Sequence, residues 1–274
     1  GIRATVDGSE IFGGNRGYIE RSVGLSLDAD QLTVFEKLSA EGKTAADALR
    51  NGEAAQGSRI FIGHTELLCT DGTRTLEDIR ELLSSRGLSP ACKLLYTDVD
   101  ACFQRMDTAS LLESLRMAER RGMIAQTDVT TALDEWMGDS ETALLPAISD
   151  SGLCMVLLHT NGRRTTLSED AANGMFWLRR NNGKEFTLAV ETPEGVQDVT
   201  ILRSSLQKKS AVQDGRSVLL YNVTVYADNC PEALHRPLQE HILRQCRTAI
   251  AEMLEADADV VGLHELAAFT QTSN

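Results

Sequence analysis

The chain has 274 residues, of which 42% are apolar, so it can bury a core and form two or three domains. Its net charge of −13 disfavours binding to nucleic acids and to anionic lipid surfaces, because both are polyanions that would repel it. No apolar run approaches the roughly 18 residues needed to cross a bilayer. The chain starts at Gly1 without a leader, so we expect native residues upstream, including an export signal.

The first hundred residues alternate between β and α patterns. In chain order we expect strands at 18–28 and 31–38, a helix at 44–50, a strand at 59–68, a helix from Thr75 to Gly87 and a strand at 92–96. Such a β-α-β-α-β succession favours compact α/β packing.

The middle of the chain is mainly helical before it returns to a strand. The expected elements are helices at 107–121 and 128–137, a strand at 153–159, a turn at Asn161-Gly162 and a helix to Leu178 capped by Ser168.

The last third alternates in the manner of an antiparallel sheet. Strands are expected at 186–190, 196–202 and 218–227, followed by a helix that opens at Pro237 and runs to Glu255. The helix carries an apolar stripe every three or four residues, so it can back the sheet. The fold class is therefore α+β, with a C-terminal antiparallel sheet backed by a long amphipathic helix.

The segment Gly42-Lys43-Thr44 suggests the end of a phosphate-binding loop. A P-loop needs a second glycine five residues before the Gly-Lys pair, and Lys37 occupies that position. We therefore interpret the segment as a turn and helix start, with Thr44 as a candidate cap and no bound nucleotide.

Two groups of residues suggest metal ligands. Cys230, His235, His241 and Cys246 have the right chemistry for zinc, but His241 and Cys246 are five apart on one helix and would point in different directions. The Asp-x-Asp pairs at 28–30, 98–100 and 257–259 lack the glycine and glutamate of a calcium loop. No metal and no cofactor is expected, and these residues are interpreted as turns, a helix end and a core thiol.

A catalytic pair is conceivable within the expected strand at 59–68. His64 and Glu66 would lie on one face of that strand, where they could act as a general base and its partner. The alternative is structural, with Gly63 allowing a close backbone approach and His64 bonding across the sheet. No GxSxG or GxGxxG motif is present, so we expect no enzymatic activity.

The order of several segments is more specific than any single motif. In chain order they are "SAEGKTAADALRN", "RIFIGHTELL", "TLEDIRELLSSRG", "DVTTALDEWMGDSETALLPAI", "GMFWLRRNNGKEFTLAV", "VTILRSSLQKKSAVQDGRSVLLYNVTV" and "LQEHILRQCRTAIAEMLEADADVVGLHEL". This succession resembles the Ger(x)C family, the C-subunit lipoproteins of spore nutrient germinant receptors. The chain is shorter than is usual for the family around 100–160, and the lipid-bearing cysteine would lie upstream of Gly1.

The resemblance implies three domains, an anchored location and a set of signature positions. The domains would be 1–57 with 152–182 as a discontinuous sheet domain, 58–151 as a middle α/β domain, and 183–274 as the C-terminal domain. The signature positions, structural or at interfaces, are Gly42, Lys43, Thr44, Gly63, His64, Trp177, Arg203, Ser204, Asp259, Gly262 and Glu265.

The implied function is that of a non-catalytic subunit needed for nutrient-triggered spore germination. It would be exported, anchored through the upstream lipidated cysteine at the outer face of the spore inner membrane, and monomeric when isolated. Its partners would be two integral-membrane receptor subunits, with no nucleic acid. Two alternatives stay open: a secreted hydrolase using His64 and Glu66, and an extracytoplasmic solute-binding protein with a large ligand pocket.

Overall fold

A computed structural model describes twelve ranges of the chain, and it divides them between two compact units. The described residues are 2–6, 9–13, 49–50, 53–54, 61–72, 75–97, 108–121, 123–125, 127–149, 152–179, 185–214 and 216–272. The first unit holds Gly1–Thr108 with Asp128–Thr130, and the second holds Ala109–Thr127 with Thr131–Asn274. The predicted division into three domains stays a prediction. The strands expected at 18–28 and 31–38, and most of the helix at 44–50, lie outside the described residues.

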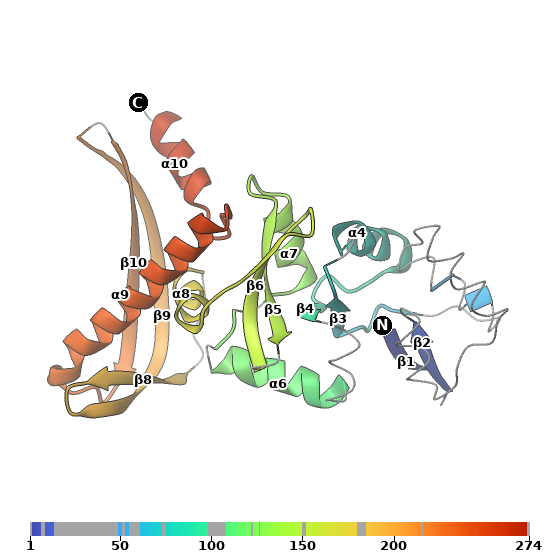
Figure 1. Ribbon diagram of the computed structural model, residues 1–274, viewed down its shortest axis with the longest axis horizontal. Helices are drawn as coiled ribbons and strands as arrows, with labels where there is room; N and C mark the ends of the chain where they lie inside the picture. Colours follow the sequence, from blue (N-terminus) through green and yellow to red (C-terminus); the bar gives the residue numbers. More distant parts are fainter. Residues whose placement is uncertain are drawn as a thin grey trace. The chain divides into compact units, whose positions relative to one another are not determined.

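The first unit contains a hairpin and a β-α-β segment (Figure 1). Strands β1 (Ile2–Val6) and β2 (Ser9–Gly13) pair antiparallel, and β3 (Leu67–Thr70) pairs in parallel with β4 (Lys93–Thr97). Helix α4 (Thr75–Arg86) connects β3 to β4 and ends, as expected, at Gly87, which has a φ of 70°.

The strand predicted at 59–68 is wrong over most of its described part. Gly63 and His64 lie in a turn closed by a hydrogen bond from the Thr65 amide to the Ile62 carbonyl at 3.0 Å. A Cβ atom at Gly63 would lie 2.4 Å from the Phe61 ring, so glycine lets the chain fold back under that ring. The apolar residues before Gly63 led to the prediction of a strand there, but the strand begins only at Leu67.

The second unit begins with two helices and an antiparallel meander. Helices α6 (Thr108–Arg120) and α7 (Val129–Trp136) confirm the expected periodic segments. Strands β5 (Thr142–Ser149), β6 (Gly152–His159) and β7 (Arg164–Thr166) follow in antiparallel order. The sequence did not predict β5, because its residues 142–147 are all buried and show no alternation.

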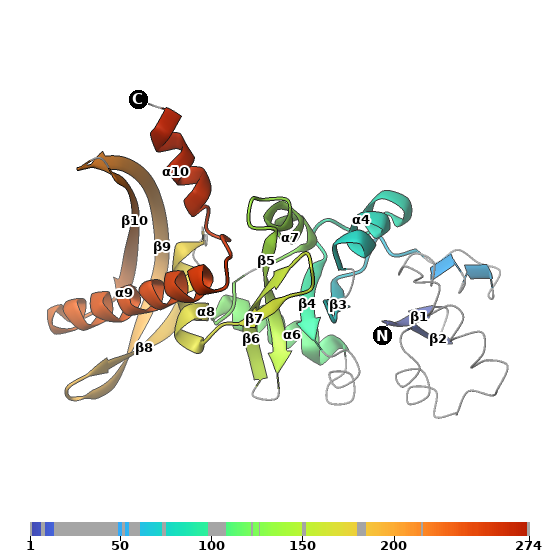
Figure 2. The ribbon, with the colours of Figure 1, turned by 45° about the horizontal axis from the view of Figure 1, so that its top comes forward.

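The C-terminal part of the second unit is a three-stranded antiparallel sheet with three helices. The strands are β8 (Phe186–Thr192), β9 (Gly195–Gln213) and β10 (Arg216–Asp228), in the order β10-β9-β8. The helices are α8 (Glu169–Leu178), α9 (Glu232–Glu255) and α10 (Leu263–Thr272). Figures 1 and 2 show β9 and β10 as a long curved ribbon, crossed obliquely by α9, with α8 beside α9. This arrangement confirms the predicted α+β class and the sheet backed by a long helix.

Two boundaries in this part differ from those predicted. Strand β9 continues eleven residues past Leu202, because backbone pairing with β10 holds a polar segment that has no apolar alternation. Helix α9 begins at Glu232, so the proline that precedes its first turn is Pro231, and Pro237 lies inside the helix. Among the described residues, no helix combines the length and the apolar character needed to cross a bilayer.

Candidate functional site around helix α9

Helix α9 organises the second unit because its two long faces meet different neighbours. One face packs along α8, and we call this contact the α8–α9 seam. The other face looks toward β10 across an open space that we call the β10 groove.

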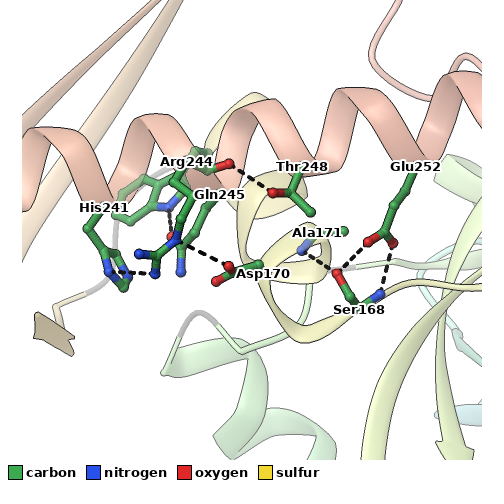
Figure 3. Close-up of polar contacts among 9 residues, drawn as sticks. Ser168, Asp170, Ala171, His241, Arg244, Gln245, Thr248 and Glu252 are labelled. Atoms are coloured by element: carbon green, nitrogen blue, oxygen red, sulfur yellow. Dashed lines mark hydrogen bonds and ion pairs between the residues drawn. The ribbon is translucent and has the colours of Figure 1, made fainter. Parts of the chain in front are cut away.

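The seam begins at the start of α8, where Ser168 and Glu252 meet (Figure 3). The Ser168 hydroxyl accepts a hydrogen bond from the Ala171 amide at 3.2 Å, which is the N-cap that the sequence predicted. The Glu252 carboxylate accepts hydrogen bonds from the Ser168 amide at 2.9 Å and from its hydroxyl at 2.5 Å. A carboxylate from α9 therefore closes the N-terminus of α8, where a negative charge is favourable.

The middle of the seam contains a buried hydrogen bond between two side chains. The Trp177 indole Nε1–H donates to the Gln245 side-chain oxygen at 2.9 Å, and both residues are buried. The Trp177 ring also contacts Phe176 and Phe186, with ring centroids 5.2 and 5.6 Å away. Gln245 therefore satisfies the one polar group of an otherwise apolar aromatic cluster.

Glycine at position 174 permits the two helices to approach each other. A Cβ atom there would lie 2.1 Å from the Gln245 carbonyl oxygen and 2.7 Å from the Ala249 side chain. Because the nearest atom belongs to backbone, a larger residue would force the helices apart. The seam is thus a close helix crossing that depends on one residue.

The exposed margin of the seam carries an ion pair and a histidine. The Arg244 guanidinium lies 3.3 Å from the Asp170 carboxylate and 3.3 Å from His241 Nδ1. Burial, and then the Arg244 charge, lower the pKa of His241 below its usual value. Its Nε2 is buried without a hydrogen-bond partner in the described part of the chain. Both effects favour the neutral imidazole of His241.

The residue after α8 forms a buried ion pair. Arg179 binds the Glu135 carboxylate, which also accepts a hydrogen bond from the Leu144 amide at 2.8 Å. Burial raises the pKa of Glu135 to about 7, while Arg179 and the Leu144 amide act in the opposite direction. This pair connects the end of α8 to the last turn of α7 within the second unit.

A partly buried polar chain connects the end of β6 to the end of α9. Arg163 lies 3.0 Å from His159 Nε2 and donates to the Ala256 carbonyl at 2.7 Å. His159 Nδ1 lies 2.7 Å from the Thr142 hydroxyl. Burial, and then the charge of Arg163, lower the pKa of His159, so its Nε2 can accept from the guanidinium.

The β10 groove occupies about 880 Å³ between α9 and the adjacent strand. On the strand side it is lined by consecutive residues from Tyr221 to Val225 and by Ala227. On the helix side the lining residues recur every three or four positions: His235, Leu238, Gln239, Ile242, Leu243, Cys246, Arg247 and Ile250. Leu178 of α8 and Cys230 complete the lining, so the groove lies mainly between one strand and one face of α9.

The signature positions do not gather in one site. Gly42, Lys43 and Thr44 lie outside the described residues, and Gly63 and His64 lie in the turn before β3. Trp177 lies in the seam, whereas Arg203 stacks on the Tyr226 ring at 4.0 Å in the sheet. Ser204 is opposite Val225 in the β9–β10 pairing.

Two of the quoted segments meet at the start of α10. The Asp259 carboxylate accepts hydrogen bonds from the Leu263 amide at 2.8 Å and the His264 amide at 2.7 Å, and Gly262 has a φ of 76°. The carbonyl of Val261 accepts from Lys208 at 2.5 Å and from Tyr221 at 3.2 Å. Glu265 follows in α10. These positions tie the α9–α10 connection to the sheet.

The groups considered for zinc, calcium and catalysis serve other contacts where they are described. His235 Nε2 contacts the Cys230 carbonyl at 3.3 Å, Cys246 is buried, and Asp259 caps α10. In the described ranges no group of three or more His, Cys, Asp or Glu residues is placed to hold a metal ion. His64 stands edge-on to Phe61, with ring centroids 5.2 Å apart, and the strand that was to align it with Glu66 is not formed there.

Sequence reasoning missed Gly174, Gln245 and Glu252 as seam residues. Glutamine and glutamate on a helix carry no pattern that names a partner some 70 or 80 residues away. Gly174 did leave a signal, because it opens the "GMFWL" segment and stands inside an otherwise good helix. A glycine at such a position indicates close packing.

One solved structure places this architecture among known proteins. The crystal structure of the GerBC protein matches with a TM-score of 0.57, covering 79% of this chain and 72% of that chain at 11% identity. The fold resembles that of GerBC. No protein-family model matches the sequence, and no curated protein matches it. At 11% identity the GerBC likeness is one of fold, and it confirms the Ger(x)C-like architecture that the resemblance implied.

Proposed function

We propose that this chain is the non-catalytic C subunit of a spore germinant receptor, needed for nutrient-triggered germination. The observation that carries the proposal is the GerBC fold over 79% of the chain, found where the sequence had independently suggested the same family. On this proposal the chain acts through contacts with two integral-membrane subunits. Its fold supplies a shaped docking module.

The proposed location is the outer face of the spore inner membrane, through a lipidated cysteine upstream of Gly1. A net charge of −13 supports a tethered module, because such a chain gains nothing from binding anionic headgroups directly. Purified chain without the anchor should therefore remain unbound when mixed with anionic vesicles in a flotation assay. Tight binding to those vesicles would contradict this part of the proposal.

Coupling to the receptor would follow from differential contacts. A ligand shifts a receptor between two states only if it binds them differently, and a docked module can bias the same equilibrium. The seam supports this role because one buried hydrogen bond, Trp177–Gln245, and one exposed hydrogen bond, Ser168–Glu252, join α8 to α9. A rigid pair of helices moves as one body, so a change in its docking contacts is passed on without deforming the pair.

The direct test is genetic. Spores lacking this chain should lose germination with nutrients and keep germination with a trigger that bypasses nutrient receptors, both followed by the fall in optical density. Re-expression of the anchored chain should restore the response, and a version whose lipidated cysteine is replaced should restore it poorly. Normal nutrient germination of spores lacking the chain would overturn the proposal.

A solute-binding protein is the second candidate, favoured by a cavity of about 810 Å³ beside α8. Its lining includes Phe176, Phe186, Asp170 and Arg244, a mixture of aromatic and charged groups suited to small polar solutes. Calorimetry of the isolated chain against amino acids and sugars tests this candidate. Binding tighter than about 10 μM would favour it over a purely contact-based role.

A further inference from the structure

The starting observation is the exposed edge of β10. This strand stands at one end of the sheet order β10-β9-β8, so within the described residues it has a strand neighbour on one side only. From Ser217 to Ala227 it contains no charged residue, no proline and no glycine. Soluble proteins usually protect such an edge with charge, proline or a bulge, since its backbone groups are available for pairing. The β9–β10 pairing shows one register shift, between Tyr226 and Ala227 at the end of this stretch, and the pairing before it is regular.

The groove lies along this edge. Consecutive residues from Tyr221 to Val225 line it, although successive side chains point to opposite faces of a strand. The cavity therefore runs along the strand over this length, between it and α9. The stretch from Tyr221 to Ala227 would accept a segment of about seven residues, roughly 20 Å long when extended.

The helical wall of the groove is apolar with one cation. Leu238, Ile242 and Cys246 are buried at its base, and Leu243 is exposed by 47% at its margin. Arg247 lines the same wall and is exposed. It has no hydrogen-bond or ion-pair partner among the residues that the structure describes, in a chain of net charge −13.

We propose that the groove binds an extended segment of a partner protein, which pairs as an added strand with β10 and places an acidic side chain against Arg247. Alternate side chains of the segment would fill the apolar wall while its backbone pairs with the edge. A second copy of this chain fits less well. Its β10 offers no carboxylate between Ser217 and Ala227, and two chains of −13 repel each other.

The groove proposal rests on the proposed docking role, because it names the surface through which docking occurs. It is tested with a defined probe: dye-labelled heptapeptides of alternating valine and threonine, each with one aspartate at a different position. Binding to the purified chain is measured by fluorescence anisotropy. At least one of these peptides should bind, and replacing its aspartate by lysine should weaken binding about tenfold.

Two variants and two matched controls locate the site. L243E and R247E should each weaken binding of the tightest-binding peptide by about tenfold or more. L254E and R236E change exposed residues of the same helix outside the groove, 57% exposed at Leu254 and 87% at the Arg236 side chain, and should bind normally. Equal weakening by a control variant would overturn the assignment to the groove.

Backbone pairing is tested by N-methylation of alternate amides, since an extended peptide presents odd and even amides on opposite edges. Of the two methylated versions, one should lose binding and the other should keep it. Retained binding in both versions would exclude strand addition. Failure of every peptide to bind below about 1 mM would overturn the proposal altogether.

Sedimentation analysis tests whether a second copy of this chain, rather than a partner protein, occupies the groove. The wild-type chain should remain monomeric, and a concentration-dependent dimer that L243E abolishes would mean that a second copy fills the groove and that the partner proposal is wrong. The peptide test and the germination test can give opposite results, so each proposal can be rejected without the other. Peptide binding with normal germination of spores lacking the chain would sink the germination role alone.

Discussion

The two faces of α9 differ in their contacts: the side chains of the seam are paired within the unit, whereas those of the β10 groove are partly exposed. At the seam, Trp177 and Gln245 satisfy each other and Glu252 closes the start of α8. At the β10 groove, Leu243 is exposed and Arg247 has no partner in the described part of the chain. The contrast separates the contacts that build the unit from the surface that remains available for another molecule.

The seam and the groove differ in whether their polar groups are buried or can contact water. A buried donor or acceptor that loses its partner costs the full desolvation of that group, so the seam tolerates little change. Groups on the groove can exchange water for a partner at little cost to folding. Substitutions in the seam should therefore lower the free energy of unfolding, and substitutions in the groove should alter binding alone.

The largest effect is expected from G174A. The new Cβ would lie 2.1 Å from the Gln245 carbonyl oxygen, so the two helices must separate. We expect the free energy of unfolding to fall by about 3 kcal/mol or more, measured by urea denaturation. The matched control is G138A, where the nearest atom would be 3.3 Å away and a loss within about 1 kcal/mol is expected. Equal losses in the two variants would show that the crossing is not tight.

The buried Glu135 should make stability depend on pH. Burial raises its pKa from 4.5 to about 7 although Arg179 acts in the opposite direction, so between these pH values the folded state binds more protons at this carboxyl than the unfolded state. This contribution is complete below pH 4.5 and is lost as the pH rises to about 7, amounting to about 3 kcal/mol at most. In E135Q the corresponding fall between pH 5 and about 7 should disappear, as followed by urea midpoints. An unchanged pH slope would contradict the raised pKa.

The buried hydrogen bond of the seam is tested by Q245L. Removing the amide leaves the Trp177 indole N–H buried without a partner, which should cost about 2 kcal/mol of unfolding free energy. Its control is Q239L, an exposed glutamine on the groove side of the same helix, with an expected change within about 0.5 kcal/mol. Indole fluorescence should also respond in Q245L only. Similar losses in both would mean that helix propensity, rather than the seam, sets the cost.

A smaller loss is expected from S168A. This change removes the cap of α8 and one of the two hydrogen bonds to Glu252, so the free energy of unfolding should fall by about 1 kcal/mol. S205A, on an exposed position of β9, should be neutral in the same thermal unfolding measurement. A neutral S168A would show that Glu252 caps α8 through the Ser168 amide alone.

The smallest effect should come from L243Q in the groove. Leu243 is 47% exposed, so its replacement should change the unfolding free energy by less than about 0.5 kcal/mol. The same variant should bind the best aspartate peptide more weakly, because it removes apolar surface from the groove wall. A large stability loss without a binding change would place Leu243 in the core and erase the difference between the two faces.

Periodic segments and local caps were predictable because the information lies within a few residues. Helix α6 followed from its apolar stripe, and α8 from Ser168 and the residues after it. Strand β5 was missed because it is buried without alternation, and the far half of β9 because only its pairing with β10 makes it a strand. The start of α9 was misplaced because two prolines competed for one helix start.

The sequence by itself determined the α+β class, the order of most elements in the second unit and the resemblance to the Ger(x)C family. Only the tertiary structure decided that Gly174 meets Gln245, that Glu252 closes the start of α8 and that β10, among the described strands, ends its sheet beside the groove that Arg247 lines. The reason is that periodicity says which face of an element is apolar. It does not say which distant face will cover it, and that choice is made by the packing of the whole unit.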